Sequence, residues 1–118
     1  MSENVTVGTS LARITHVEVQ QAEVVAVQIK NNGAAALNAF QLRGRSGDGS
    51  HGFLTLQSSG FTTSGIHCIY ASSEPGVLAS GAECILYLTP GYLRDIELWA
   101  STASGTADIT ISATRMEG

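Results

Sequence analysis

The sequence predicts an all-β protein, a single antiparallel β-sandwich of about eight strands, and three observations predict it. Val, Ile and Thr, whose branched side chains favour strands, are abundant in the apolar segments. Short runs of alternating apolar and polar residues recur, separated by Gly, Pro, Asn and Ser. Segments of the length of a helix show no helical period. With 118 residues, the chain has the length of one domain, and an immunoglobulin-like or jelly-roll-like sandwich fits it.

The N-terminal residues divide into two predicted parts. Residues 1–10 are mostly polar and are predicted to form an N-terminal arm, in which Asn4–Gly8 is either a short arm or an edge strand. Residues 11–118 are predicted to form the single sandwich domain. Its first strand is Leu11–Val19, in which Ile14 breaks the alternation of apolar residues.

The next two predicted strands show the clearest alternation. In Glu23–Lys30, the residues expected to face the core are Val25, Val27 and Ile29. The Asn-Gly pair at Asn32-Gly33 indicates a tight turn after this strand, since both residue types tolerate a positive φ. In Leu37–Arg45, the expected inward residues are Phe40, Leu42 and Gly44, and the expected outward residues are Gln41, Arg43 and Arg45.

The second half of the chain continues with short strands and turns. Gly44–Gly52 contains four glycines and is predicted to be a loop, and Ser58–Gly65 is predicted to be a polar connection. The predicted strands are Phe53–Gln57, Ile66–Ala71, Glu83–Thr89, Leu93–Ala100 and Thr106–Ala113.

Composition excludes several classes of function. The net charge is −4, with one lysine and five arginines, which disfavours nucleic-acid binding by phosphate neutralisation. No apolar run approaches the roughly 20 residues of a membrane span, and the N-terminus lacks the pattern of a secretion signal, so we expect folding in a reducing compartment. Charged residues make up 14% of the chain. A surface so poor in charge fits either a protein that packs against partners or a small β domain with many tight turns.

The residues that usually carry chemistry show no recognised motif. The histidines His16, His51 and His67 lack metal-ligand spacing, so no metal site and no cofactor are predicted. No catalytic residues are predicted either. Asp95 and Glu97 share one face of a predicted strand, and we expect that face to be solvated.

Three further positions are candidates for contact or cross-linking. Cys68 and Cys84 lie on different predicted strands with core-facing parity, so they are either a disulfide or buried free thiols. His51 lies in the glycine loop and is a candidate contact residue. Trp99 shares the face of Asp95 and Glu97, where it is either an outward interface anchor or a core residue covered by the second sheet.

The C-terminal half carries a resemblance to a known group of proteins. The segments are 78–81 (Leu-Ala-Ser-Gly), 86–88 (Leu-Tyr-Leu), 90–101 (from Pro-Gly-Tyr-Leu to Trp-Ala-Ser) and 105–111 (Gly-Thr-Ala-Asp-Ile-Thr-Ile). This order of strand and turn segments resembles that of the small β-sandwich virion proteins of tailed bacteriophages. The strand–Asn-Gly–strand pattern over Val25–Leu42 also resembles the hairpin of Ig-like adhesion modules.

The resemblance implies a non-enzymatic structural protein of the virion, assembled in the host cytoplasm. The implied role is that of a capsid decoration (cement) protein or a minor head or tail protein. Its partners would be the major capsid protein or other virion proteins, and further copies of itself in a homo-oligomer such as a trimer. Because mature shells are often acidic outside, the candidate contacts are Arg13, Arg43 and Arg45, with the arm at residues 1–10.

Two other readings remain at this point. One is a carbohydrate- or receptor-binding module of a tail or fibre, which aromatic residues such as Tyr87, Tyr92 and Trp99 would serve. The other is a ring protein of the neck or tail, which differs from a decoration protein in its copy number.

Overall fold

The computed structural model describes residues 2–20, 22–47, 52–59, 67–71, 78–88 and 93–117. In these residues the chain forms strands and no helix. The strands are β1 (Ser2–Val7), β2 (Ala12–Glu18), β3 (Ala22–Asn31), β4 (Leu37–Arg45), β5 (Leu54–Ser59), β6 (His67–Ala71), β7 (Glu83–Leu88), β8 (Asp95–Thr102) and β9 (Ala107–Glu117).

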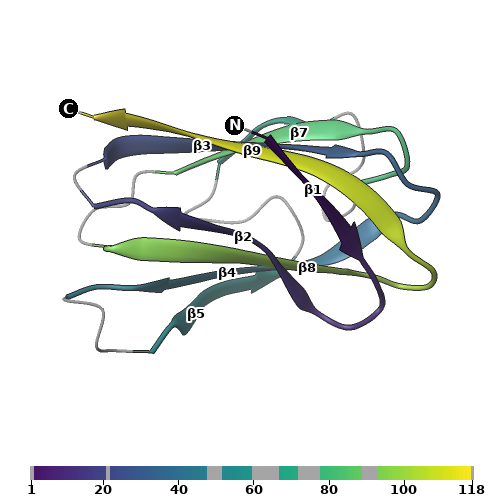
Figure 1. Cartoon of the computed structure of the whole chain (residues 1–118), viewed down its shortest axis with the longest axis horizontal. Coiled ribbons are helices and arrows are strands. Elements are labelled where there is room, and N and C mark those ends of the chain that lie inside the picture. The colour runs from purple at the N-terminus through teal and green to yellow at the C-terminus, as the bar shows by residue number, and fades with distance from the viewer. Residues whose placement is uncertain are drawn as a thin grey trace.

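The strands form two antiparallel sheets that pack face to face as a β-sandwich (Figure 1). The five-stranded sheet has the order β1-β9-β3-β7-β6, and the four-stranded sheet has the order β2-β8-β4-β5. The predicted all-β sandwich is therefore confirmed, with nine described strands instead of about eight.

The strand order decides between the two predicted sandwich types. The chain pairs with itself in nested order: β1 with β9, β2 with β8, β3 with β7 and β4 with β5. Further ladders join β9 to β3 and β8 to β4, and β6 extends the five-stranded sheet at its edge. A folded-over ribbon of paired strands wound into two sheets is the arrangement of a jelly roll.

The core lies between the sheets and follows the predicted alternation. Val25, Val27 and Ile29 of β3 are completely buried. From the same sheet, β9 adds Ala107, Ile109 and Ile111. The other sheet contributes Ile96, Leu98 and Ala100 of β8, together with residues of β2 and β4. Burial of these side chains removes apolar area from water, at roughly 25 cal/mol per Å².

A β-bulge explains why Ile14 departs from the alternation of its strand. The register of β2 against β8 shifts between Arg13 and Thr15, so Ile14 is an extra residue in the ladder. The extra residue reverses the parity of the strand, and Ile14 and Thr15 are both buried.

The N-terminal segment follows the second of its two predicted alternatives, an edge strand, and is part of the sandwich instead of a separate arm. Ser2–Val7 forms β1, an edge strand paired with β9 along its whole length. Val7 is completely buried, and Val5 packs against the core. The alternation of Val5 and Val7 supplies the apolar face that ties this segment to the sandwich.

The turn after β3 depends on close packing instead of a positive φ. A Cβ atom on Gly33 would lie 2.6 Å from the Cα of Ala107 and from the backbone nitrogen of Asp108. Positive φ values occur instead at Gly47, Gly81 and Gly105. Our explanation for the Asn-Gly pair was therefore wrong: the glycine is needed because β9 begins against it.

The glycine-rich loop begins later than predicted. Gly44 and Arg45 belong to β4, and Gly47 lies in the turn after it. β5 starts at Leu54 and continues to Ser59, into the segment that we predicted as a connection. His51 lies outside the described residues.

Candidate functional site

The outer face of the four-stranded sheet carries most of the residues that we selected from the sequence. Three strands contribute outward side chains in register, with β8 in the middle. We call this surface the charged face; its members are Arg13, His16, Glu18, Gln41, Arg43, Arg45, Asp95, Glu97 and Trp99.

The register sets the neighbours across the charged face. Trp99 lies between Arg13 and Gln41, and Glu97 lies between His16 and Arg43. Directly opposite residues in an antiparallel ladder share a face and have neighbouring Cβ atoms. Asp95 lies between Glu18 and Arg45, and His16 of β2 also reaches it. Each acidic residue of β8 therefore has a basic side chain within reach on both flanking strands.

Asp95 is the centre of one half of this face. Its side chain is only 3% exposed. Arg45 donates two hydrogen bonds to it, from Nε to Oδ1 over 2.7 Å and from a terminal nitrogen to Oδ2 over 2.9 Å. His16 Nε2 also donates to Oδ2 over 2.7 Å, since a carboxylate can only accept.

This arrangement stabilises the charged form of Asp95. The hydrogen bonds from Arg45 lower the pKa of the Asp95 carboxyl below its usual range, and His16 lowers it further. Burial acts in the opposite direction and is outweighed. The same pair raises the pKa of Arg45. Both charges are therefore permanent at neutral pH, and they neutralise each other.

Glu97 is the centre of the other half. Its Oε2 accepts a hydrogen bond from Arg13 over 3.1 Å, and its Oε1 accepts one from Trp99 Nε1 over 3.1 Å. The side chain is 9% exposed, whereas that of Arg13 is 55% exposed. Arg13 therefore covers Glu97 and presents the rest of its guanidinium to solvent.

Aromatic rings support the arginines of β4. The guanidinium of Arg43 stacks over the ring of Trp99, 3.8 Å from its centroid, and Arg43 also donates two hydrogen bonds to Gln41 Oε1. The guanidinium of Arg45 lies 4.4 Å from the ring centroid of Phe53. His16 meets the same ring edge-on. Such stacking fixes the plane of each guanidinium.

The expectation that Asp95 and Glu97 form a solvated face was wrong. As whole residues they are 2% and 7% exposed. The physical reason is tertiary: arginines from strands far away in the sequence fold over them from both sides. Trp99 is half-buried on the outer face and does not lie between the sheets, so the core alternative was wrong, and its role as an interface anchor stays a prediction.

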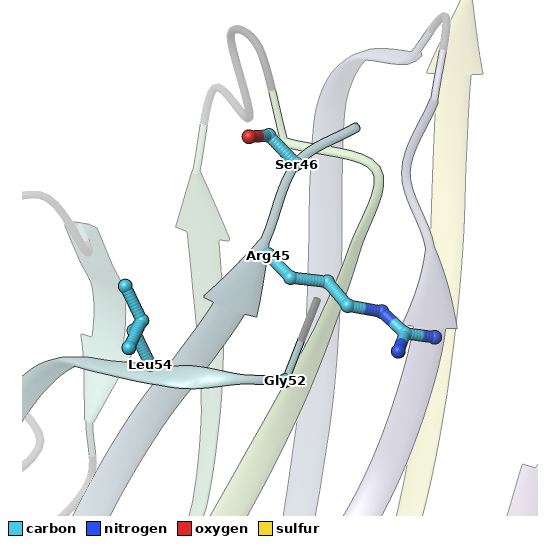
Figure 2. Close-up of a pocket in the computed structure, with 4 residues that line it drawn as sticks. All are labelled: Arg45, Ser46, Gly52 and Leu54. Atoms are coloured by element: carbon cyan, nitrogen blue, oxygen red, sulfur yellow. The ribbon is translucent and has the colours of Figure 1, made fainter. Parts of the chain in front are cut away.

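A hollow borders this face at the end of β4. It has a volume of about 410 Å³ and is lined by Arg45, Ser46, Gly52 and Leu54. Figure 2 shows the Arg45 side chain pointing away from Leu54. Its guanidinium donates to Asp95, and the residue also lines the hollow. The Leu54 residue is 70% exposed.

The structure brings together Arg13, Arg43, Arg45 and Trp99 on one surface. Sequence reasoning missed His16 and the structural role of the two carboxylates. A signal was present: basic residues two apart in β4 (Arg43, Arg45) match the acidic residues two apart in β8, a pattern typical of paired strands.

The cysteines do not face each other directly across their ladder. β6 pairs with β7 so that Cys68 lies opposite Leu86, and Cys84 lies opposite Ala71. Cys84 is completely buried. The side chain of Cys68 lies outside the described ones, so the choice between a disulfide and two thiols stays open.

The described part of the chain lacks two other features, a metal-ligand cluster and a membrane-spanning helix. None of its residues form a group of three or more His, Cys, Asp or Glu side chains that could hold a metal ion. Within the same residues, no helix has the length and hydrophobicity needed to cross a membrane.

Comparison with known proteins extends the fold assignment. The chain matches no protein-family model and no curated protein sequence. It is similar to the crystal structure of PirA, with a TM-score of 0.55 over 97% of this chain and 92% of that one. The two sequences are 13% identical, so the similarity is one of fold. The protein is thus an all-β sandwich whose outer four-stranded face holds a fixed network of arginines, carboxylates and one tryptophan.

Proposed function

We propose that this protein is a non-enzymatic structural protein of a phage particle, a capsid decoration protein that binds the assembled shell through the charged face. One observation carries the choice of surface. Arg13, Arg43, Arg45 and Trp99 lie on one sheet face, and their orientations are fixed by hydrogen bonds and ring stacking.

The residue types on this face support a contact role. Trp and Arg are the residues that most often dominate binding energy at protein interfaces. A long arginine side chain ordinarily loses rotamer freedom on binding, at about 0.5–1.5 kcal/mol. Here Asp95 and Gln41 already hold two of the arginines, so part of that entropy is lost on folding.

The exposed groups of the face indicate the chemistry of the partner. The side chains of Arg13 and His16 are 55% and 37% exposed, whereas those of Glu97 and Asp95 are 9% and 3% exposed. In these pairs the donors are the more exposed groups and the carboxylates of Asp95 and Glu97 are covered, while Glu18, opposite Asp95, is the one exposed carboxylate on these strands of the face. An acidic surface, such as we expect on a mature shell, is the complementary partner.

The fold is compatible with this role. Jelly-roll sandwiches occur in viral capsid domains and in lectin domains. A fold does not by itself choose a function, so the assignment rests on the face and on the resemblance of the sequence to phage virion proteins. In the proposed role the protein acts as a homo-oligomer on the major capsid protein, without nucleic acid or membrane as a partner.

Copy number in purified particles of the source phage tests the proposal. Mass spectrometry would compare this polypeptide with the major shell protein. Near-stoichiometric abundance is the result expected for decoration. A few copies per particle would indicate the neck, tail or fibre, and complete absence from particles would refute the virion role.

Site-directed variants test the docking surface separately. Arg43→Ala and Arg13→Ala should each weaken binding to undecorated shells about tenfold or more, since each loses on the order of 1.4 kcal/mol of contact energy. Thr114→Ala, an exposed position on the other sheet, is the matched control and should bind like the wild type. Equal binding by all three variants would show that the charged face does not dock.

A carbohydrate-binding module is the second candidate. The half-buried Trp99 beside Glu97 and Arg13 is an arrangement that could stack on a sugar ring and bond its hydroxyls. Against it, Arg43 already covers one side of the indole ring. Sugar-dependent quenching of the fluorescence of Trp99 would favour this candidate, and no response across a glycan panel would weaken it.

A further inference from the structure

The edge strands of the two sheets differ in one respect. In the described part of the chain the edges are β1 and β6 in one sheet, and β2 and β5 in the other. Three of these edge strands contain an extra residue that shifts the register, at Ile14 in β2, Leu56 in β5 and Ile69 in β6. β1 alone pairs with its neighbour in unbroken register, from Ser2 to Val7.

Bulges are one of the ways in which proteins prevent edge strands from pairing with other chains. They bend the strand and interrupt its row of outward N–H and C=O groups. Proline and lysine on the edge serve the same purpose. β1 (Ser2–Val7) contains neither, and Glu3 is its one charged residue. This edge therefore lacks the protection that the other edges have.

β1 is held in a regular extended conformation. Val5 and Val7 pack on the core side. On the opposite face, Thr6 donates a hydrogen bond to Asp108 over 2.8 Å, and Asn4 Oδ1 accepts one from Thr110 over 3.1 Å. A strand fixed on both faces is a preorganised template for another strand.

The space beside this edge is open. Figure 1 shows β1 at the margin of the five-stranded sheet, with β2 as the adjacent strand of the other sheet. Between them is a hollow of about 330 Å³, lined by Glu3 and Val5 of β1 and by residues 13–16 of β2. The core-side groups of an added strand would point toward this hollow.

We propose that β1 pairs antiparallel with β1 of a second copy of this chain, which joins the two five-stranded sheets across a two-fold axis. In an antiparallel pair, residues directly opposite share a face. The register that places Val5 opposite Val5 of the partner subunit meets this requirement. It also places Asn4 opposite Thr6 of the partner subunit, a neutral pair of hydrogen-bonding side chains.

Charge favours the same register. Because Glu3 is the one charged residue of β1, self-pairing is opposed only when the two Glu3 carboxylates lie opposite each other. The register centred on Val5 places Glu3 opposite Val7 of the partner subunit. The contact uses one surface on both copies, so it closes as a dimer. The β1 edge borders the hollow that Arg13 and His16 of the charged face also line, so the two proposals are separated by their readouts: mass in solution for the dimer and shell binding for the charged face.

The test uses the full chain and measures its mass in solution. Sedimentation equilibrium of the wild type should show a reversible dimer. Asn4→Pro and Val5→Pro form an informative pair, since neighbouring residues of a strand send their N–H groups to opposite sides. One proline removes a donor to β9 and should lower thermal stability. The other removes only an outward donor, so it should abolish the dimer and lower the melting temperature no further than the alanine variant at the same position does.

Matched controls separate the loss of the N–H group from the change of side chain. Asn4→Ala and Val5→Ala keep both backbone donors, and each should remain dimeric. In addition, Val5→Cys should form a disulfide-linked dimer on mild oxidation, whereas Thr114→Cys, on the exposed outer face of β9, should not. This cross-link decides the matter even if both proline variants unfold.

Several results would overturn the inference. They are a wild type that stays monomeric at high concentration, a trimer, a dimer that survives in the proline variant that is as stable as its alanine control, or a failure of Val5→Cys to cross-link. None of these results bears on whether the charged face binds a shell.

Discussion

The guanidinium of Arg43 lies over the indole ring of Trp99, 3.8 Å from the ring centroid, although the two residues are 56 positions apart in the sequence. The stack joins β4 to its neighbour β8 on the outer face of the sheet. Because Trp99 is the one tryptophan of the chain, its fluorescence reports on this contact directly.

Replacing Arg43 should therefore change both stability and the fluorescence spectrum. Arg43→Ala is expected to lower the free energy of unfolding by about 1 kcal/mol, the usual size of a cation–π contact. It should also shift the emission of Trp99 to longer wavelength, because the indole gains contact with water. Arg43→Lys keeps the charge without the planar group, so it should restore only part of the effect. Lys30→Ala, on the other sheet, is the control, and an unchanged spectrum in Arg43→Ala would contradict the stack.

The pair between Arg45 and Asp95 should contribute measurably to stability. Asp95→Asn removes the charge that holds Arg45 and His16. We expect a loss of about 2 kcal/mol in chemical unfolding, the size of a hydrogen-bonded charge. The loss is moderated because the Arg45 and His16 side chains are 23% and 37% exposed and can turn toward water. Asp108→Asn, an exposed carboxylate with one hydrogen bond, should cost less than about 0.5 kcal/mol.

The same pair predicts a pH dependence with a definite sign. The pKa of Asp95 is lowered in the folded protein, while in the unfolded chain it is about 3.9. The stabilisation is therefore complete above about pH 4–5 and disappears as the pH falls through the lower folded pKa. Unfolding free energies of wild type and Asp95→Asn should converge as the solution is acidified. A difference that stays constant down to strongly acidic pH would contradict the ion pair.

Asn31 is predicted to be a critical buried polar residue. It is completely buried, and its amide nitrogen donates to the carbonyl oxygens of Ala35 and Leu78 over 2.8 and 3.0 Å. Asn31→Asp places a carboxylate against two carbonyls, so we expect a cost of about 3 kcal/mol or more. Asn38→Asp makes the same chemical change at an exposed site and should be nearly neutral. Similar melting temperatures for the two variants would refute this role.

Gly33 and Gly8 form a matched pair for a test of close packing. In Gly33→Ala the new methyl group would meet backbone atoms of β9 at 2.6 Å. Backbone atoms cannot avoid the clash by changing rotamer as a side chain can, so we expect the free energy of unfolding to fall by about 2 kcal/mol. In Gly8→Ala the added methyl group meets nothing within 4 Å, and stability should be unchanged or slightly higher. Equal stability of the two variants would show that the turn can relax.

Much of the fold could be predicted because alternation is a local signal. The inward residues of β3 follow directly from the spacing of apolar residues, and the structure buries Val25, Val27 and Ile29 as predicted. Ile14 shows the limit of this signal, since a single bulge reverses the parity of all that follows. For β1 the sequence left an arm and an edge strand open, because its polar outer face masks the contribution of Val5 and Val7.

The candidate site was predicted only in part. Arg43, Arg45 and Trp99 were selected one by one, by residue type. Their assembly into one surface depends on the order of the strands in the sheet. The alternation of apolar and polar residues in β8 does not reveal that order, because it would be the same beside any neighbouring strands. The expected solvation of Glu97 failed for this reason, because its cover is Arg13, 84 positions away.

The sequence by itself determined the all-β class, the strands and which side of most strands is apolar. These properties depend on residues that are neighbours along the chain, since side chains alternate with a period of two. The tertiary structure decided the jelly-roll order, the burial of Asp95 and Glu97 under arginines, and the regular edge at β1. Each of these depends on long-range pairing, where the energy comes from charges and backbone groups that meet only after the sheets have formed.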